Sequence, residues 1–447
     1  MDTIKNHFQK IVEQARQDGA KVELLLSGGE NLKLGYQKSK LETFESTQSQ
    51  VAGFRVILKS AQGYAYTENL SYESLLRTYK DALANAQTLG EKSKDEVPLM
   101  KPSQIQPMSH LFREENIPME KKMEAAKTLE EACFKADPRV QAVPYCSFNE
   151  SVSFYRILNS EGLDHEFRQS YYSGYSYPIV KDDTGSKTDY ESFFARSFND
   201  IKAHEVAETS VKSAASRLGA QKLHTGNYPV VIDRDVFTTF ITMITDYFSA
   251  KEVDEKRSLF VGKLGQKIAD EKFNLIDDPF NERGTGVRPF DSEGAPSQKT
   301  VLIEKGVLKN FLTNLEYAHK MKLPHTAHAY RGPSSSMAIA PTNLVMEKGT
   351  SSLHDLLNRP GKVIHITNLN GALHSGFKEG TGDFSLPAEG FLYENGKLVG
   401  PIDQFVMSGN IFDVLEKIEA LGNEYNKIGS SIMTPDVLVR ELSFAGA

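Results

Sequence analysis

The sequence predicts a multi-domain α+β protein with a small N-terminal α+β domain, a middle domain and a larger, β-rich C-terminal domain. Its 447 residues correspond to about three domains at roughly 150 residues each. Apolar residues recur at helical spacing in some segments and alternate as in strands in others. Four prolines lie among polar residues between positions 98 and 118, which is typical of a linker. The expected units are 1–97, the linker 98–118, 119–220 and 221–447.

The N-terminal domain is predicted from two helices that flank strand-like segments. Apolar residues between Ile4 and Ala15 recur at helical spacing, and Gly19 is a plausible stop. A second helix is expected to begin after the N-cap Ser71 and to end at Gly90. Four strands are expected between the helices: 22–26, 32–36, 54–58 and 64–67.

The middle domain reads as helix, paired strands and helix. Residues 119–136 carry an apolar stripe at helical spacing. Two strands, 151–157 and 163–172, are separated by a turn, and Tyr and Phe enrichment favours strand beyond them. A long helix is expected over 200–218, ending at Gly219.

The C-terminal domain is predicted to be mostly β. A helix over 233–251 has one apolar face, and a capped helix is expected over 410–421. The dipeptide Asn395-Gly396 is the strongest two-residue hairpin signal in the chain. The expected strands are 228–232, 301–303, 307–308, 391–393, 397–399 and 437–444.

The composition excludes several classes of function. Lys and Arg total 52 against 59 Asp and Glu, which gives a formal net charge of −7. An acidic chain lacks the basic surface of a nucleic-acid binder, so we expect no direct nucleic-acid contact. No apolar run reaches about 18 residues, so no membrane helix is expected. The two cysteines and the charged N-terminus, which lacks a signal-peptide pattern, predict a cytoplasmic protein.

Two histidine-containing segments are candidate metal sites. The segment HEVAE (204–208) matches the start of the zinc-protease motif H-E-x-x-H, but Glu208 replaces the second histidine. We interpret it as the solvated face of a helix. His319, His325 and His328 could place ring nitrogens near one ion, but no adjacent carboxylate or thiolate completes the set. A polar loop is favoured there, with a metal loop as the alternative.

Other catalytic chemistry finds little support. The glycines at 284–286 and 371–382 are not followed by a helical pattern, so a phosphate-binding loop is not expected. Cys133 lies on an apolar helix stripe, and nothing beside Cys146 would activate a thiolate. The residues alone therefore indicate a soluble α+β protein without a recognisable catalytic constellation.

Several short segments, in order, resemble the TldD/PmbA family, also called modulators of DNA gyrase. They are GFRV (53–56), GYA (63–65), FDSEGAP (290–296), GVLKNFL (306–312), TGDFSLPAEGF (381–391), ENG (394–396) and SGN (408–410). The resemblance covers almost the whole chain and implies the PmbA/TldD-like fold. The family that the chain resembles has two branches. TldD-type proteins are zinc metallopeptidases with the motif H-E-x-x-x-H and a cysteine near the C-terminus as third ligand, and PmbA/TldE-type proteins are their partners and lack this site.

The resemblance places the chain in the PmbA/TldE branch. It aligns the motif's first histidine, glutamate and second histidine with Ile241, Thr242 and Asp246, and no cysteine follows Cys146. The family's third zinc ligand, the late cysteine, would fall near Ser430, where the side chains of this sequence carry only hydroxyl groups. Because isoleucine cannot ligate zinc, we expect no metal or other cofactor on this chain and zinc on the partner only.

The resemblance therefore implies a non-catalytic subunit of a TldD-type metallopeptidase complex acting on unfolded or leader-type peptides. The expected partners are a TldD-type subunit and an unfolded peptide, without a membrane. Two alternatives stay open: an independent hydrolase, with His319, His325 and His328 as its site, and a gyrase- or DNA-related interaction protein. Homodimerisation of the isolated chain is also left open.

Overall fold

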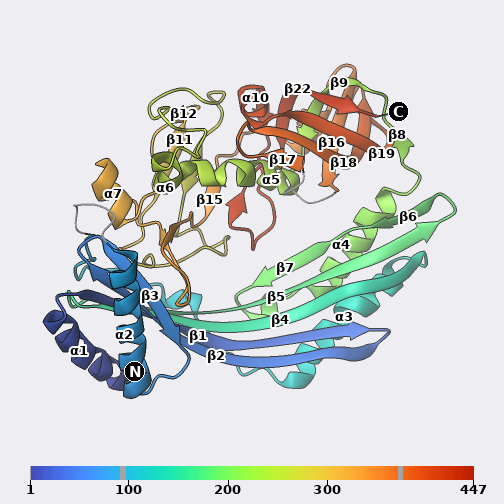
Figure 1. The fold of residues 1–447 in the computed structure, drawn as a ribbon. Helices are drawn as coiled ribbons and strands as arrows, with labels where there is room; N and C mark the ends of the chain where they lie inside the picture. Colours follow the sequence, from blue (N-terminus) through green and yellow to red (C-terminus); the bar gives the residue numbers. More distant parts are fainter. Residues whose placement is uncertain (1, 91–96, 371–375, 447) are drawn as a thin grey trace.

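The computed structural model describes residues 2–90, 97–370 and 376–446. A long, curved sheet is built from roughly the first 200 residues, and the C-terminal domain lies over one face of it (Figure 1). The architecture is thus α+β with a β-rich C-terminal region, as predicted.

Seven strands form the curved sheet in the order β3-β2-β1-β4-β5-β6, and β7 also pairs with β5. All its pairings are antiparallel. Because β1 pairs with β4, the N-terminal and middle segments share one sheet. The strands are Lys21–Gln37 (β1), Lys40–Leu58 (β2), Ala61–Thr67 (β3), Val140–Asn159 (β4), Asp164–Asp182 (β5), Gly185–Thr188 (β6) and Glu191–Ala195 (β7).

The expectation of two separate strands over 22–26 and 32–36 is wrong, because β1 runs through Gly28 and Gly29 without interruption. The glycines permit close strand approach. A Cβ at Gly28 would meet the Ser49 carbonyl oxygen at 2.4 Å, and one at Gly29 would meet that of Val152 at 2.1 Å. The close approach of β2 on one side and β4 on the other therefore explains these two glycines.

Helices cover the two ends of the curved sheet (Figure 1). Helices α1 (Asp2–Gln17) and α2 (Tyr72–Leu89) pack on one end around Phe8, Phe54 and Tyr79. The caps predicted for α2 are confirmed: Ser71 accepts from the Ser74 N–H, and Gly90 ends the helix.

Helices α3 (Met119–Ala136) and α4 (Ala203–Ser216) pack against each other and on the other end of the sheet. The helix expected over 200–218 is shorter at both ends, because α4 begins at Ala203 and ends at Ser216. A 3₁₀ turn, η2 (Phe198–Asp200), precedes it. The proline-rich segment contains a second turn, η1 (Ser109–Leu111), and Leu111 is buried against the C-terminal domain.

The C-terminal domain contains two sheets and a short hairpin. An eight-stranded sheet has the order β17-β18-β16-β9-β22-β19-β8 with β20 on β22, and the β18–β19 pairing closes five of these strands into a ring. A five-stranded sheet has the order β12-β11-β10-β15-β21. The eight strands are Gln221–Lys222 (β8), Gly226–Ile232 (β9), Lys362–Leu369 (β16), Phe377–Lys378 (β17), Asp383–Glu394 (β18), Lys397–Asn410 (β19), Ile418–Leu421 (β20) and Val437–Ala445 (β22). The others are Leu275–Asp277 (β10), Thr300–Glu304 (β11), Val307–Leu308 (β12), Ala329–Tyr330 (β13), Ala338–Ile339 (β14), Leu344–Met346 (β15) and Ile432–Met433 (β21).

Two predicted helices of this domain are wrong in length. The helix expected over 233–251 divides into α5 (Arg234–Thr245), η3 (Asp246–Phe248) and α6 (Ala250–Asp254). It breaks because Ser249 is extended and Ala250 donates to the Leu312 carbonyl. The helix expected over 410–421 ends as α10 (Ile411–Glu416), since the next residues pair as β20. Short helices α7 (Leu315–Met321) and α8 (Leu353–Leu357) lie in the same domain.

The hairpin at Asn395-Gly396 is confirmed between β18 and β19. The largest apolar core lies in this domain, where α5 buries Phe237, Phe240 and Ile244. In the part of the chain that the structure describes, no helix is both long and apolar enough to cross a bilayer.

Candidate functional site

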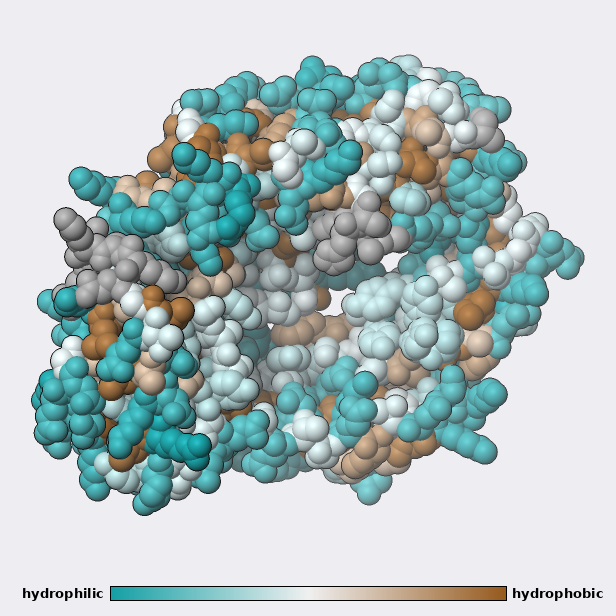
Figure 2. All heavy atoms as spheres, in the orientation of Figure 1, coloured by the Kyte–Doolittle hydropathy of each residue, from teal (hydrophilic) through white to brown (hydrophobic). Residues whose placement is uncertain are grey.

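A large cleft lies between the edge of the curved sheet and the C-terminal domain. Its volume is about 940 Å³, within the size range of ligand pockets. Figure 2 shows the molecule opened between these two parts. Residues of β5, β7 and the end of α4 line one wall, and the start of α5, the end of β16 and the segment 426–430 line the other.

Helix α5 presents a polar face to this cleft. Its N-cap Asp233 accepts the Asp235 N–H on Oδ1, and both residues line the cleft. The hydroxyls of Thr238, Thr242 and Thr245 each donate to a carbonyl three or four residues earlier in the helix. These hydroxyls are thus engaged with the helix backbone.

The three positions aligned with the family zinc motif do not face one way. Ile241 is 0% exposed and packs in the core beside Phe237 and Ile244. Thr242 and Asp246 are exposed, and Asp246 already belongs to η3. Ser430 lines the cleft, but its Oγ accepts the Ile432 N–H.

The residues at these positions do not fit a zinc ion. Zinc in proteins is bound by nitrogen, sulfur or carboxylate oxygen, and the Ile241 side chain offers none of these. The Thr242 hydroxyl donates to the Thr238 carbonyl, and a threonine hydroxyl cannot act as a general base near neutral pH. No step of zinc chemistry can therefore be assigned to α5.

The histidines predicted as an alternative metal loop are separated. His319 is exposed on α7. His328 is fully buried, with Nε2 2.8 Å from Asp277 Oδ1 and Nδ1 2.9 Å from Thr326 Oγ1. His325 instead approaches two carboxylates. Within the described residues these three histidines do not form a common ligand group.

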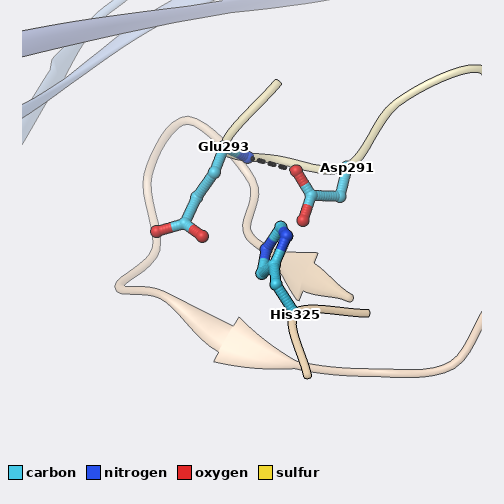
Figure 3. A group of neighbouring side chains, drawn as sticks. All are labelled: Asp291, Glu293 and His325. Atoms are coloured by element: carbon cyan, nitrogen blue, oxygen red, sulfur yellow. Dashed lines mark hydrogen bonds between the residues drawn. The ribbon is translucent and has the colours of Figure 1, made fainter. Parts of the chain in front are cut away.

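His325, Asp291 and Glu293 form the one group of three potential metal ligands in residues 2–90, 97–370 and 376–446. One ligand atom from each lies within 4.8 Å of the others, and the side chains converge from two loops (Figure 3). Burial lowers the pKa of His325. Sequence reasoning did not pair His325 with these acids, because 32 or more residues separate them.

The carboxylates of this group are already engaged. Asp291 Oδ1 accepts the N–H groups of Glu293 and Ala295, and Oδ2 accepts that of Ala329. Glu293 Oε1 accepts from Arg55 at 2.9 Å, and Oε2 accepts the Leu315 N–H. Because the Arg55 guanidinium already balances the negative charge of Glu293, the group is better explained as part of a buried ion pair that holds the fold together than as a metal site.

Sequence reasoning also missed a pair of titratable residues, Asp233, which lines the cleft, and its neighbour His365. Asp233 Oδ2 is 3.8 Å from His365 Nε2. They meet because β9, which leads into Asp233, runs parallel to β16, which carries His365, and Asp233 donates its N–H to the Ile366 carbonyl. Burial, with the neighbouring Asp235 and Asp436, raises the pKa of Asp233 to about 7. Burial, with Arg234, lowers the pKa of His365 to about 4.

The remaining candidates lie outside the cleft. His204, Glu205 and Glu208 are exposed on α4, in agreement with a solvated helix face. Cys133 is fully buried, and burial raises the pKa of both Cys133 and Cys146 to about 11. Neither cysteine would therefore be a thiolate at neutral pH.

Comparison with known proteins finds one family along the length of the chain. Three family models match in succession: PmbA/TldA metallopeptidase domain 1 over residues 22–86, the central domain over 112–218 and the C-terminal domain over 225–446. A metalloprotease PmbA homolog from Haemophilus influenzae is 27% identical over 442 residues, covering 97% of this chain and 94% of that protein.

Solved structures agree with the sequence comparisons. A modulator of DNA gyrase from Thermotoga maritima superposes with a TM-score of 0.90 at 26% identity, over 99% of this chain and 100% of that one. TldE from Thermococcus kodakarensis has the same fold, with a TM-score of 0.86 at 20% identity over 98% and 100% of the two chains. With three successive domain models matched along its length, the chain belongs to the PmbA/TldD family.

Proposed function

We propose that this chain is a non-catalytic, PmbA/TldE-type subunit of a TldD-type zinc metallopeptidase complex that acts on unfolded or leader-type peptides. The carrying observation is helix α5, where Ile241 is fully buried and the Thr242 hydroxyl is bonded to the helix backbone. The helix retains its packing but offers no ligand set at the motif positions. The metalloprotease names of its relatives support the peptidase setting.

The cleft gives such a subunit a peptide-binding role. Four successive β7 residues, 191–194, line it. Among the described strands β7 pairs only with β5, so its second edge is unpaired. An unpaired edge can accept an extended peptide through backbone hydrogen bonds, largely independently of sequence. This suits an unfolded substrate.

The test is a peptide-cleavage assay with four samples: this chain, a TldD-type protein from the same organism, both together, and both with a chelator. We expect cleavage to rise on mixing and to vanish with the chelator. A stable pair needs an interface of about 1,000 Å² or more, so the two proteins should also co-elute on a sizing column. Robust cleavage by this chain alone would overturn the proposal.

A cleft-filling variant separates assembly from substrate handling. Thr239 lines the cleft, so Thr239→Trp should leave co-elution intact and remove most of the stimulation. Thr209→Trp is the matched control, because Thr209 is exposed on α4 and does not line the cleft. If both variants stimulate like the unmodified chain, the cleft does not receive the peptide.

A further inference from the structure

Two buried polar atoms on β16, near the start of α5, have no hydrogen-bond partner among the described residues. His365 is 6% exposed, yet its Nε2 makes no hydrogen bond. Thr367, two residues further along β16 at a register shift of the strand, also has a buried, unpartnered hydroxyl and lines the cleft. Buried polar atoms in proteins are nearly always paired, so the unpaired Nε2 of His365 indicates a missing partner.

The space between His365 and Asp233 suits a ligand group that donates hydrogen bonds to both residues. Its Nε2 faces Asp233 Oδ2 at 3.8 Å, which is too long for a direct hydrogen bond. With the His365 ring neutral and its proton on Nδ1, both atoms are acceptors. A nitrogen carrying several protons can stand about 2.9 Å from each of two acceptors at this separation. An ammonium group has three donors, so it can serve both acceptors at once.

The local charge favours a cation. Two carboxylates, Asp436 and Glu424, pair with the Arg234 guanidinium, and two more, Asp233 and Asp235, lie beside each other at the start of α5. A helix N-terminus alone would favour an anion, but this concentration of carboxylates reverses the preference. The raised pKa of Asp233 has the same origin, since its neighbours repel a further negative charge.

The cationic side chains on the cleft walls do not supply the missing charge. Arg217 pairs with Asp189 at 2.9 Å and lies 3.7 Å from Glu389. Lys427 is bonded to Glu191 on β7. The uncompensated charge of the described cleft therefore resides at Asp233 and Asp235.

We propose that Asp233, which lines the cleft, and His365 beside it form a subsite that binds an ammonium or guanidinium group of the peptide received by the cleft. This inference rests on the proposed peptide-binding function and adds a preference to it. The cation is either the side chain of a lysine or arginine, or the N-terminal amine of the peptide. The subsite fixes the peptide's register, because backbone pairing with β7 alone would allow it to slide.

The test uses the full chain and four fluorescent decapeptides with one neutral background sequence. All have an amidated C-terminus; three are N-acetylated, with a central lysine, arginine or norleucine, and the fourth has norleucine and a free N-terminus. Fluorescence polarisation at pH 8 measures their affinities. We expect at least one cationic peptide to bind about tenfold more tightly than the acetylated norleucine peptide. Whether the lysine and arginine peptides or the free-amine peptide gain affinity identifies the source of the cation.

Asp233→Asn removes the charge and keeps an N-cap of equal quality, so α5 should still fold. This variant should bind all four peptides with equal affinity. Asp81→Asn is the matched control, because Asp81 is exposed on α2 and outside the cleft. It should keep the full preference, and thermal melts should show both variants folded.

The outcomes separate this inference from the function on which it rests. Equal affinity of the unmodified chain for all four peptides would mean that only a water bridges Asp233 and His365, and would overturn the subsite alone. Binding of no peptide would overturn both the subsite and peptide binding by this chain. The subunit role would then stand or fall on the mixing assay with the TldD-type protein.

Discussion

Arg55 on β2 and Glu293 in the loop between β10 and β11 form a fully buried ion pair across 238 residues of sequence. Arg55 Nη1 lies 2.9 Å from Glu293 Oε1, and both side chains are 0% exposed. Glu23 on β1 lies 3.8 Å from the same Nη1 and pairs with Arg331 at 2.8 Å. Two arginines and two glutamates, all out of contact with water, therefore join the curved sheet to the C-terminal domain.

Removing one member of this joint should be costly. Arg55→Met leaves Glu293 buried without its cation, and breaking a buried pair costs about 3–5 kcal/mol. Denaturant unfolding should show this loss. Arg55→Met combined with Glu293→Gln should lose less than the sum of the two single variants, since neither charge is then stranded.

A surface pair is the control for this joint. Lys33 and Glu45 lie 4.0 Å apart and are both about half exposed. Glu45→Gln should therefore change stability by only about 0–1 kcal/mol. If Arg55→Met proved as mild as Glu45→Gln, the joint would not hold the two parts together.

The second prediction concerns neighbouring residues on α5. Ile241→Ala should lower the free energy of unfolding by about 2–5 kcal/mol, because it removes buried apolar atoms and leaves a cavity. Thr242→Ala should cost less than about 0.5 kcal/mol, since Thr242 is exposed and alanine is a better helix former. Denaturant melts of both variants decide. Equal, small effects would place Ile241 outside the core.

Local signals explain which elements could be predicted from the sequence. The α2 caps at Ser71 and Gly90 and the Asn395-Gly396 hairpin depend on neighbours within a few residues, and these were predicted correctly. The break in the helix after Phe248 depends on Leu312, which lies 64 residues away. No pattern within the helix itself could have shown it.

The candidate site was harder to predict for the same reason. Asp233 was read only as the start of a helix, and His365 lies 132 residues further on. They meet through the parallel pairing of β9 with β16, which local periodicity does not specify. His325 likewise reaches Asp291 and Glu293 through the packing of two loops.

The third prediction is that the isolated chain binds no stoichiometric zinc. Its physical reason is the donor set: α5 offers no ligand at Ile241, and beside His325 the Glu293 carboxylate is paired with Arg55 while Asp291 accepts three backbone N–H groups. Elemental analysis after mild dialysis is the measurement. About one zinc per chain would contradict the prediction, and loss of that zinc in His325→Ala would locate it at the group with Asp291 and Glu293.

The last prediction follows from Asp233. Burial, Asp235 and Asp436 raise its pKa to about 7 in the folded chain, from an ordinary value of 3.8. The folded state therefore holds the Asp233 proton more tightly than the unfolded state. The stability this contributes is fully present below about pH 4 and is lost as the pH rises through about 7. Asparagine is neutral throughout, so the variant escapes this loss.

Asp233→Asn should therefore become more stable relative to the unmodified chain as the pH rises. We expect a gain of about 1–3 kcal/mol at pH 8 over the difference at pH 4.5, measured by urea unfolding. His365, whose pKa is lowered to about 4, titrates in both proteins, so its contribution largely cancels in the comparison. Asp81→Asn, on the exposed face of α2, should show no such trend. Parallel stability curves for Asp233→Asn and the unmodified chain would mean that Asp233 is ionised without strain, and the excess of negative charge at the start of α5 would then be compensated within the chain itself.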